Sequence, residues 1–277
     1  MLKLIQITDC HLMPEGERLF ESDPAARLGE AIDSVIAEHA DAALVVLTGD
    51  LAHDGLPEAY RILRRELARL PMPWQLVPGN HDDRAALRDV FPEVEADAEG
   101  FLQTVRDLAG LRLLFLDTVD PGVHSGAYCA ARRAWLAEAL RGADGRPACL
   151  FMHHPPMPIG IPRLDQYGLA EPEAFAGVLE GQPIRQIFFG HVHRPLSGSW
   201  RGIPFSALPG TNHQNQLVLS AGRENLSSLE PPAYAVILID AASTLVHLHA
   251  FADRSLRFVY DPDAPPGQQV RRIPPGP

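Results

Sequence analysis

Six short apolar runs constrain the fold of this chain more than any other feature of its sequence. They have the length of β-strands and lie at residues 2–8, 43–48, 74–78, 111–117, 148–152 and 186–190. Segments with helical spacing and helix-forming residues lie between several of them, at residues 23–40, 56–70, 130–141 and 171–181. Runs this dense in apolar residues are typical of strands buried on both faces. The alternation therefore predicts an α/β fold in which helices cover both faces of a sheet.

The pattern changes after residue 195. Four strand-like segments follow one another with no helical segment between them: "IPFSALP", "NQLVLSA", "AYAVILID" and "LVHLHAF". This texture predicts a second, more antiparallel sheet. We expect residues 1–260 to form a single domain, in which residues 200–260 are the more antiparallel β region and make an oligomer contact. Residues 261–277 are rich in Pro and Gly, and we expect a tail with little regular structure.

The formal net charge of −11 over 277 residues argues against a nucleic-acid or anionic-membrane partner, because such partners need a basic protein face. No apolar run is long enough to cross a membrane. The three cysteines, Cys10, Cys129 and Cys149, have no paired spacing, which favours neither a disulfide framework nor a cysteine-rich zinc module. The first residues lack the charged and apolar regions of a secretory signal. We therefore expect a cytoplasmic protein.

Polar motifs follow five of the apolar runs. They are "TDCH" (8–11), "TGD" (48–50), "PGNHD" (78–82), "MHHPP" (152–156) and "GHVH" (190–193). Because ligands of open α/β sheets bind beyond the carboxyl ends of the strands, we expect these side chains to share one rim. Carboxylate oxygens and neutral imidazole nitrogens suit borderline divalent ions such as zinc, manganese, iron and cobalt. The sequence therefore indicates a two-metal site.

Asp50 is the expected bridge between the two ions. A carboxylate has two oxygens and can serve two cations, and the neighbouring Gly49 relieves crowding beside it. Gly79 and Gly190 precede other candidate ligands, and we expect these glycines to adopt the conformations that turn a strand end toward a central ion.

Each candidate ligand also has a structural interpretation when it is taken alone. Asp9 or Asp50 could cap a helix, and Asn80 could hold a left-handed turn. His153 or His154 could be a core histidine with satisfied nitrogens. Five such motifs in order, all at strand ends, make coincidence improbable. Five other histidines fit no such motif, and we interpret them as structural or surface residues: His39, His53, His124, His247 and His249.

The order of the motifs resembles the hallmark of the calcineurin-like metallophosphoesterase superfamily. The matching segments are Asp9–Cys10–His11, Gly49–Asp50, Gly79–Asn80–His81–Asp82, His153 and Gly190–His191–Val192–His193. Within the superfamily the chain is most similar to bacterial class III cyclic nucleotide phosphodiesterases and glycerophosphodiesterases. The resemblance implies a four-layer αββα sandwich, in which helices flank two mixed β-sheets.

The resemblance also implies which residues hold the two divalent ions, whose identity (Fe, Mn, Zn or Co) stays open. One ion would be held by Asp9, His11, Asp50 and His193, and the other by Asp50, Asn80, His153 and His191. Of the adjacent His153 and His154, we assign the first to the metal and expect the second to point to the other side.

The implied function is hydrolysis of a small soluble phosphodiester, a glycerophosphodiester or a cyclic nucleotide, by attack of a metal-bound hydroxide. His81 is the catalytic residue expected beside the leaving group, and Asn80, His81 and His213 are expected to contact the substrate. The sequence offers no obvious base-reading signature. A phosphomonoesterase, a nuclease and a non-catalytic metal-binding scaffold are the alternatives. We expect a homodimer or a higher homo-oligomer.

Overall fold

The computed structural model describes residues 1–222, 226–252, 257–260, 265, 268 and 270–273. Its helices are α1 (Pro24–His39), α2 (Pro57–Leu67), α3 (Arg84–Val90), α4 (Ala130–Arg141), the 3-10 helix η1 (Asp165–Tyr167) and α5 (Pro172–Leu179). Its strands in the first half of the chain are β1 (Leu2–Ile7), β2 (Leu44–Thr48), β3 (Trp74–Val77), β4 (Thr104–Leu108) and β5 (Leu111–Phe115). The next are β6 (Ala148–Met152), β7 (Ile184–Phe189), β8 (Leu196–Trp200), β9 (Ile203–Ala207) and β10 (Gln214–Asn215). The last are β11 (Ser227–Ser228), β12 (Ala233–Ile239), β13 (Thr244–Ala250), β14 (Arg257–Tyr260) and β15 (Val270–Ile273).

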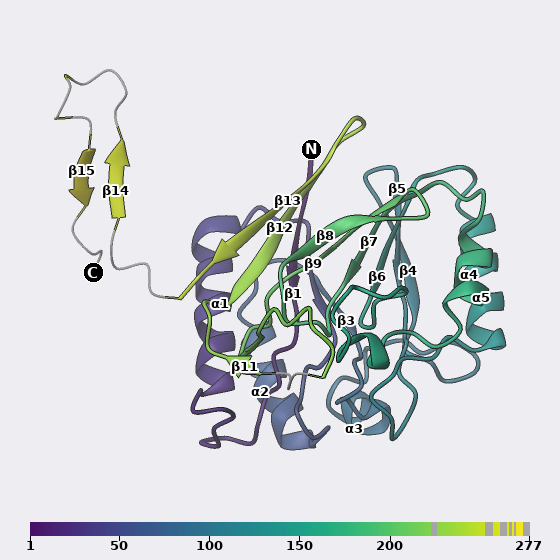
Figure 1. Cartoon of the computed structure of the whole chain (residues 1–277), viewed down its shortest axis with the longest axis horizontal. Helices are drawn as coiled ribbons and strands as arrows, with labels where there is room; N and C mark the ends of the chain where they lie inside the picture. The colour runs from purple at the N-terminus through teal and green to yellow at the C-terminus, as the bar shows by residue number, and fades with distance from the viewer. Residues whose placement is uncertain (223–225, 253–256, 261–264, 266–267, 269, 274–277) are drawn as a thin grey trace.

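Two large mixed sheets form the centre of the molecule (Figure 1). The first has five strands in the order β13-β12-β1-β2-β3, and the second has six in the order β4-β5-β6-β7-β9-β8. The strands β1, β2 and β3 are parallel to one another, and so are β5, β6, β7 and β9. The remaining pairs in these sheets are antiparallel.

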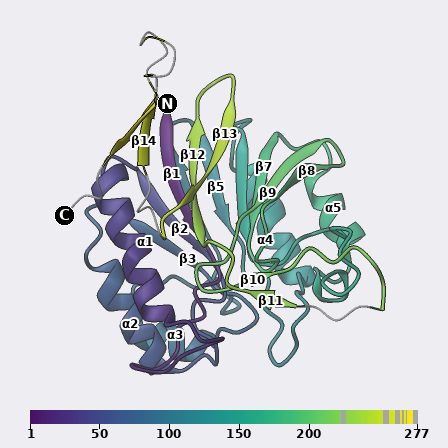
Figure 2. The ribbon, with the colours of Figure 1, turned by 60° about the vertical axis from the view of Figure 1, so that its left-hand side comes forward.

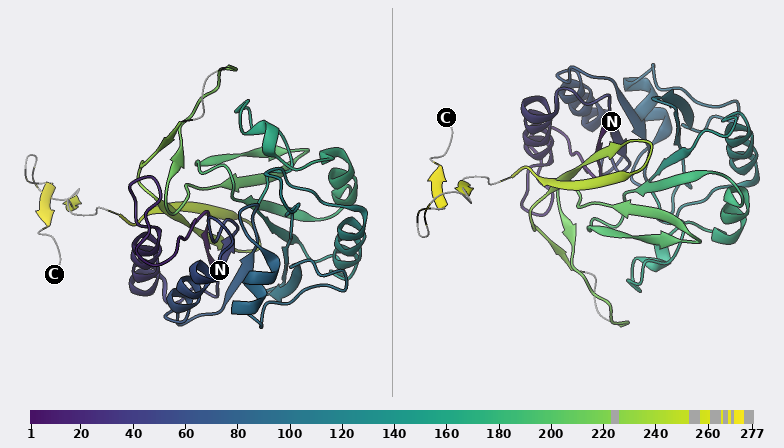
Figure 3. Two further views of the ribbon diagram at one scale, coloured as in Figure 1. Left: turned by 90° about the horizontal axis from the view of Figure 1, so that it is seen from below. Right: turned by 90° about the horizontal axis from the view of Figure 1, so that it is seen from above.

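Three buried clusters show that the sheets and helices form four layers. Strand β1 alternates: Leu4 points into the cluster between the two sheets, whereas Ile5 and Ile7 point into the cluster beneath the N-terminal helices. Helices α1 and α2 cover the outer face of the first sheet, and α4 and α5 lie on the opposite side of the molecule against the second (Figures 1 and 2). The view from below shows the same order of layers (Figure 3). The predicted αββα sandwich is confirmed.

The prediction of a separate antiparallel C-terminal sheet was wrong. Strands β12 and β13 extend the first sheet beyond β1, and β8 and β9 extend the second sheet beyond β7. Each sheet thus combines parallel and antiparallel strands. An apolar run indicates that a strand will be buried, but it does not indicate which sheet the strand joins or which strand it pairs with.

The segment "NQLVLSA" is not the strand that its alternation predicts. Of its residues only Asn215 belongs to a strand, the two-residue β10 that pairs with β11, and the following Leu217 and Leu219 are 58% and 63% exposed. The short polar elements β4, β8 and α3 were not predicted. Strand β4 contains no buried residue, because it is an edge strand of the second sheet.

The C-terminal tail contains regular structure that its composition did not predict. Strand β15, which has β-branched residues at both ends (Val270 and Ile273), pairs antiparallel with β14. This two-stranded ribbon lies apart from the two large sheets (Figure 1). Most other residues of 261–277 lie outside the described residues.

Two further observations concern the chain as a whole. Within the described ranges, no helix combines the length and the apolar character that crossing a membrane requires. Cys10, Cys129 and Cys149 are all free thiols.

Candidate metal centre

The motif-bearing strand ends meet at one place, but they come from two sheets. β1, β2 and β3 belong to the first sheet, and β6 and β7 to the second. The expectation of a rim on one open sheet is therefore corrected: the carboxyl ends of strands from both sheets face a common site. A direct link between them is the backbone N–H of His191, which follows β7 and donates to both carboxylate oxygens of Asp9, which follows β1, at 3.1 Å.

The backbone at the site is held in an uncommon conformation. Five candidate ligands have a positive φ: Asp9 (52°), His11 (45°), Asp50 (48°), His191 (68°) and His193 (48°). L-residues rarely adopt this left-handed region, and such outliers concentrate at functional sites.

The glycines beside the ligands serve two different purposes. Gly49 has a φ of +94°, as expected for a glycine that turns a strand end, and a Cβ there would also lie 2.3 Å from His153 Nδ1. Gly79 and Gly190 do not have positive φ, which corrects the expectation for them. They are needed for space, since a Cβ on Gly79 would lie 2.3 Å from the backbone nitrogen of Asp50.

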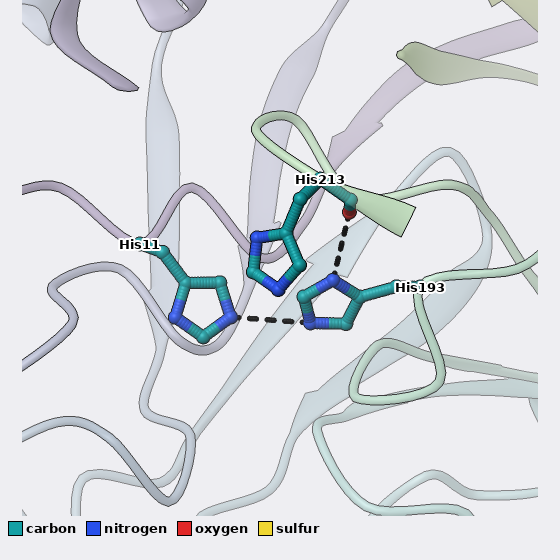
Figure 4. A group of neighbouring side chains, drawn as sticks. All are labelled: His11, His193 and His213. Carbon is teal, nitrogen blue, oxygen red and sulfur yellow. Dashed lines mark hydrogen bonds between the residues drawn. The ribbon is translucent and has the colours of Figure 1, made fainter. Parts of the chain in front are cut away.

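One group of inward-facing atoms comes from Asp9, His11, Asp50 and His193. The Nε2 atoms of His11 and His193 are 3.1 Å apart. Asp9 Oδ1 lies 3.2 Å from His193 Nε2, and Asp50 Oδ2 lies 3.5 Å from His11 Nε2. Figure 4 shows the rings of His11 and His193 converging from different segments of the chain. These are the four residues that the family resemblance assigns to the first ion.

A second group lies on the other side of Asp50. Asp50 Oδ1 is 3.3 Å from His153 Nε2, which is 3.1 Å from Asn80 Oδ1. His191 Nδ1 completes the group at 3.0 Å from Asn80 Oδ1 and 3.3 Å from His153 Nε2. The two oxygens of Asp50 thus face two different sets of nitrogen and oxygen atoms, as the predicted bridge requires.

Protein acceptors and a neighbouring ring fix the orientation of three of the imidazoles. His153 Nδ1 donates to the carbonyl oxygen of Thr48 at 2.9 Å, and His193 Nδ1 donates to that of His213 at 2.8 Å. His11 Nδ1 lies 3.2 Å from His53 Nδ1. Each contact leaves Nε2 to face the centre. Such outer partners are the usual means by which proteins hold metal-ligating histidines.

The adjacent His153 and His154 contact different partners. His153 presents Nε2 to Asp50 and Asn80, whereas both ring nitrogens of His154 are engaged elsewhere. His154 Nδ1 lies 2.7 Å from Thr118 Oγ1, and its Nε2 donates to the carbonyl oxygen of His124 at 3.1 Å. This geometry favours His153 as the ligand and His154 as a support for the loop that carries His124.

Burial and neighbouring charges together shift the pKa values of the groups at this site. Burial opposes protonation of His153, but the adjacent Asp50 outweighs it and raises the pKa of His153 to about 9. Burial together with the nearby His153 lowers the pKa of His191 to about 3. The histidines in turn hold the pKa of Asp50 well below its usual range despite burial. The site therefore contains ionised Asp50, neutral His191 and protonated His153, and His153 must release its proton before its nitrogen can ligate a metal.

The residues fit divalent ions. The Nε2 atoms of His11 and His193 lie 3.1 Å apart, close enough that one cation would be held by both. In addition, the buried Nε2 of His191 has no hydrogen-bond partner among the described residues. The donor set contains oxygen and nitrogen without thiolate, which suits zinc, manganese, iron or cobalt and does not discriminate among them.

Asp82 holds together the loops that follow β2 and β3. This buried carboxylate accepts hydrogen bonds from the backbone N–H groups of Leu51, Ala52 and Gly79 at 3.1, 3.0 and 2.8 Å, and from the hydroxyl of Tyr60 at 3.0 Å. Burial and the charge of Asp50 raise its pKa to about 6. Asp82 thereby ties the loop after β2 to the loop after β3, which carries Asn80.

His81 lies beside the metal groups rather than within them. Its backbone N–H donates to Asp50 Oδ1 at 2.9 Å, and its Nδ1 donates to the carbonyl oxygen of His53 at 2.6 Å. Because a carbonyl only accepts, the second bond places the ring hydrogen on Nδ1 and leaves Nε2 available. Its ring lies 4.8 Å from that of His11. This position is compatible with the predicted place beside the leaving group.

Two histidines that we interpreted as structural or surface residues belong to this site. His53 stacks on His81 at 4.9 Å and contacts the candidate ligand His11 through Nδ1. His124 Nδ1 lies 3.3 Å from the amide nitrogen of Asn80. His53 is only three residues from Asp50, and this proximity could have identified it. Nothing near His124 in the sequence could have done so.

A cavity of about 320 Å³ opens onto both groups. Its lining residues are His11, Phe20, Asp50, His53, Asn80, His81, His124, Leu164, Tyr167, His191, His193, His213 and Asn215. The ring of His213, predicted as a substrate contact, packs against those of His193 at 4.4 Å and His11 at 5.0 Å (Figure 4). The other predicted substrate contacts, Asn80 and His81, line the same cavity.

Two mixed sheets between helices, with two facing groups of candidate Asp, Asn and His ligands at their strand ends, define the metallophosphatase fold class. Comparison with known proteins agrees. The model of the calcineurin-like phosphoesterase family matches residues 2–195. The chain belongs to this family.

Several relatives are similar over most of their length. The probable cyclic nucleotide phosphodiesterase of Rhodopseudomonas palustris is 41% identical over 254 residues, which cover 90% of this chain and 93% of the relative. The glycerophosphodiester phosphodiesterase of Enterobacter lignolyticus is 32% identical over 219 residues, covering 76% and 78%. A solved dimetal phosphatase from Danio rerio shares the fold, with a TM-score of 0.69, 14% identity and 99% coverage of each chain.

Proposed function

We propose that this protein is a metal-dependent phosphodiesterase that hydrolyses small phosphodiesters. The observation that carries the proposal is the position of Asp50, whose two carboxylate oxygens face two separate groups of nitrogen and oxygen ligands. The names of relatives at 41% and 32% identity, a cyclic nucleotide phosphodiesterase and a glycerophosphodiester phosphodiesterase, support the same reaction class.

In this proposal Asp50 would serve both ions, and each group would supply the remaining ligands. The first set is completed by Asp9, His11 and His193, and the second by Asn80, His153 and His191. A pair of divalent ions held there supplies Lewis acidity toward phosphoryl oxygens and lowers the pKa of water. Asn80 contributes a neutral oxygen, and its side chain also lines the cavity that receives substrate.

His81 acts on the leaving group in this proposal. Its Nδ1–H is committed to the carbonyl of His53, so Nε2 is the nitrogen that faces substrate. When protonated, Nε2 donates to the departing oxygen, a step that contributes about 10²–10⁴-fold for a well-placed acid. His213, whose ring lies 5.0 Å from that of His11, contacts the second ester arm or a non-bridging oxygen in this proposal.

The lining of the cavity favours a diester over a monoester. None of the described residues that line it is lysine or arginine. A monoester dianion carries one more negative charge than a diester, and cationic side chains usually hold such a charge. The diester presents a second organic arm instead, which suits the apolar Phe20, Leu164 and Tyr167 in the wall.

The test compares a bis-aryl phosphate with the corresponding mono-aryl phosphate on the metal-loaded protein. The expected result is a kcat/KM at least tenfold higher for the diester. Faster turnover of the monoester would assign the protein to the phosphomonoesterases instead.

We also propose self-association through the region 217–251. Strand β13 is an outer strand of the first sheet, and its Leu245 and Leu248 are each 45% exposed. The more exposed Leu217 and Leu219 lie in the same stretch of chain. Exposed edges with apolar side chains are surfaces that proteins cover by association. In this proposal a homodimer forms at the exposed edge of β13.

We propose a cytoplasmic location. Three free cysteines fit a reducing compartment, where thiols are not oxidised to disulfides. Fractionation of the native host with an antibody to the protein tests this, and recovery in the periplasmic fraction would contradict it.

A further inference from the structure

Phe20 occupies a strained turn at the mouth of the cavity. Leu19 and Ser22 exchange backbone hydrogen bonds of 2.9 and 3.0 Å, so Phe20 and Glu21 are the two central residues of a tight turn. Both are left-handed, with φ of 49° and 62°. Two left-handed central residues are the mark of a type I′ turn, which strongly favours Asn-Gly. An aromatic residue in this conformation is a genuine outlier.

The strain does not serve to bury the ring. Phe20 is 51% exposed, which makes it one of the most exposed large apolar side chains of the described residues. Its ring lines the cavity and lies 4.6 Å from the ring of His213. Strained backbone that presents an exposed group at a site is expected where the group has a function there.

Phe20 stands at one end of an arc of rings around the cavity. Successive centroids along the arc are 4.6, 5.0, 4.8, 5.7 and 5.8 Å apart, through Phe20, His213, His11, His81, His124 and Tyr167. Of the histidines in the arc, His11 belongs to the first metal group and His213 packs against it. Phe20 and Tyr167 are the two ends of the arc, and both line the cavity.

We propose that Phe20 is a specificity-determining residue: its ring is the platform on which a planar arm of the diester stacks, so that the site selects cyclic nucleotides over alkyl diesters such as glycerophosphodiesters. The inference rests on the proposed phosphodiesterase function and adds the substrate class. A nucleobase presents a flat π-face that gains from an aromatic platform, whereas a glycerol arm presents hydroxyls that gain nothing from it.

The test replaces Phe20 with Asn. Asn is favoured in left-handed turns, so Phe20→Asn removes the ring while it relieves the backbone. Glu21→Asn relieves the same turn and keeps the ring, and it is the matched control. Phe20→Tyr keeps an aromatic platform. Inhibition constants of 3′,5′-cyclic AMP, 2′,3′-cyclic AMP and glycerophosphoethanolamine are measured on each metal-loaded protein against hydrolysis of bis(4-nitrophenyl) phosphate.

We expect Phe20→Asn to weaken binding of at least one cyclic nucleotide about tenfold, the size of one base–aromatic stack, and to leave glycerophosphoethanolamine unchanged. Phe20→Tyr and Glu21→Asn should retain the wild-type ratio of each cyclic nucleotide's inhibition constant to that of glycerophosphoethanolamine. If Phe20→Asn leaves the ratio of the cyclic-nucleotide constants to that of glycerophosphoethanolamine unchanged, or weakens all the ligands equally, the inference about Phe20 is overturned. The proposed phosphodiesterase function is not affected by that result. Absence of aryl diester hydrolysis by the wild type overturns the proposed function, and this inference with it.

Discussion

Asp50→Asn should remove one ion almost completely. The substitution keeps the shape of the side chain and removes its charge. In the second group Asp50 is the only anionic side chain, since Asn80, His153 and His191 complete it. Two unit charges 4 Å apart interact by about 4 kcal/mol at an effective dielectric of 20. For a divalent ion the loss is larger, so the affinity of the second group should fall by about a thousandfold or more.

The first group retains Asp9, so Asp50→Asn should bind one ion per chain where the wild type binds two. Metal content after dialysis, measured by mass spectrometry, and activity on an aryl diester check this. Asp54→Asn is the matched control, because it removes an exposed carboxylate from the same loop. It should keep two ions and full activity. Two tightly bound ions in Asp50→Asn, or Asp9→Asn losing more metal than Asp50→Asn, would refute the bridging role.

His81→Ala should slow alkyl diesters at least tenfold more than aryl diesters, because only the poor leaving group needs a proton, and metal content should stay normal; equal losses in kcat would exclude leaving-group chemistry. His53→Ala should lower metal affinity about 10–100-fold, because the contact to His11 Nδ1 is lost. A calorimetric Kd equal to that of the wild type would show that His53 does not support the metal site. Light scattering at micromolar concentration should give the mass of a dimer for the wild type, and of a monomer for the Leu245→Lys, Leu248→Lys double variant; a monomeric wild type contradicts the proposed interface.

Local sequence patterns predicted the bounds of some helices and strands. Helix α4 and strand β6 have the bounds expected from their residues, because a helical pattern or an apolar run states its own extent. The order of the strands in the two sheets was not predictable from such patterns. Strands β1 and β12 are both apolar, yet only long-range packing decides that β12 pairs antiparallel with β1 and lies within the first sheet.

The candidate site divides in the same way. Residues at strand ends were predictable, because strand direction brings carboxyl ends together. His124 and Phe20 lie on loops that reach the cavity only through the fold. Phe20 was hidden further by its chemistry: a Phe-Glu pair carries none of the Gly or Asn that normally marks a type I′ turn.

The strain of the ligand backbone is sustained by bonds between the ligand loops themselves. Asp9 N–H donates to the carbonyl oxygen of Gly49 at 3.0 Å, and His11 N–H donates to that of Asp50 at 2.8 Å. Left-handed residues cost about 1–3 kcal/mol each and persist only where their surroundings over-determine them. Here each loop over-determines the other, and these bonds involve protein atoms alone. The loop after β1 therefore cannot relax without releasing the loop after β2. A change at Gly49 should accordingly displace Asp9 as well as Asp50, and with them ligands of both groups.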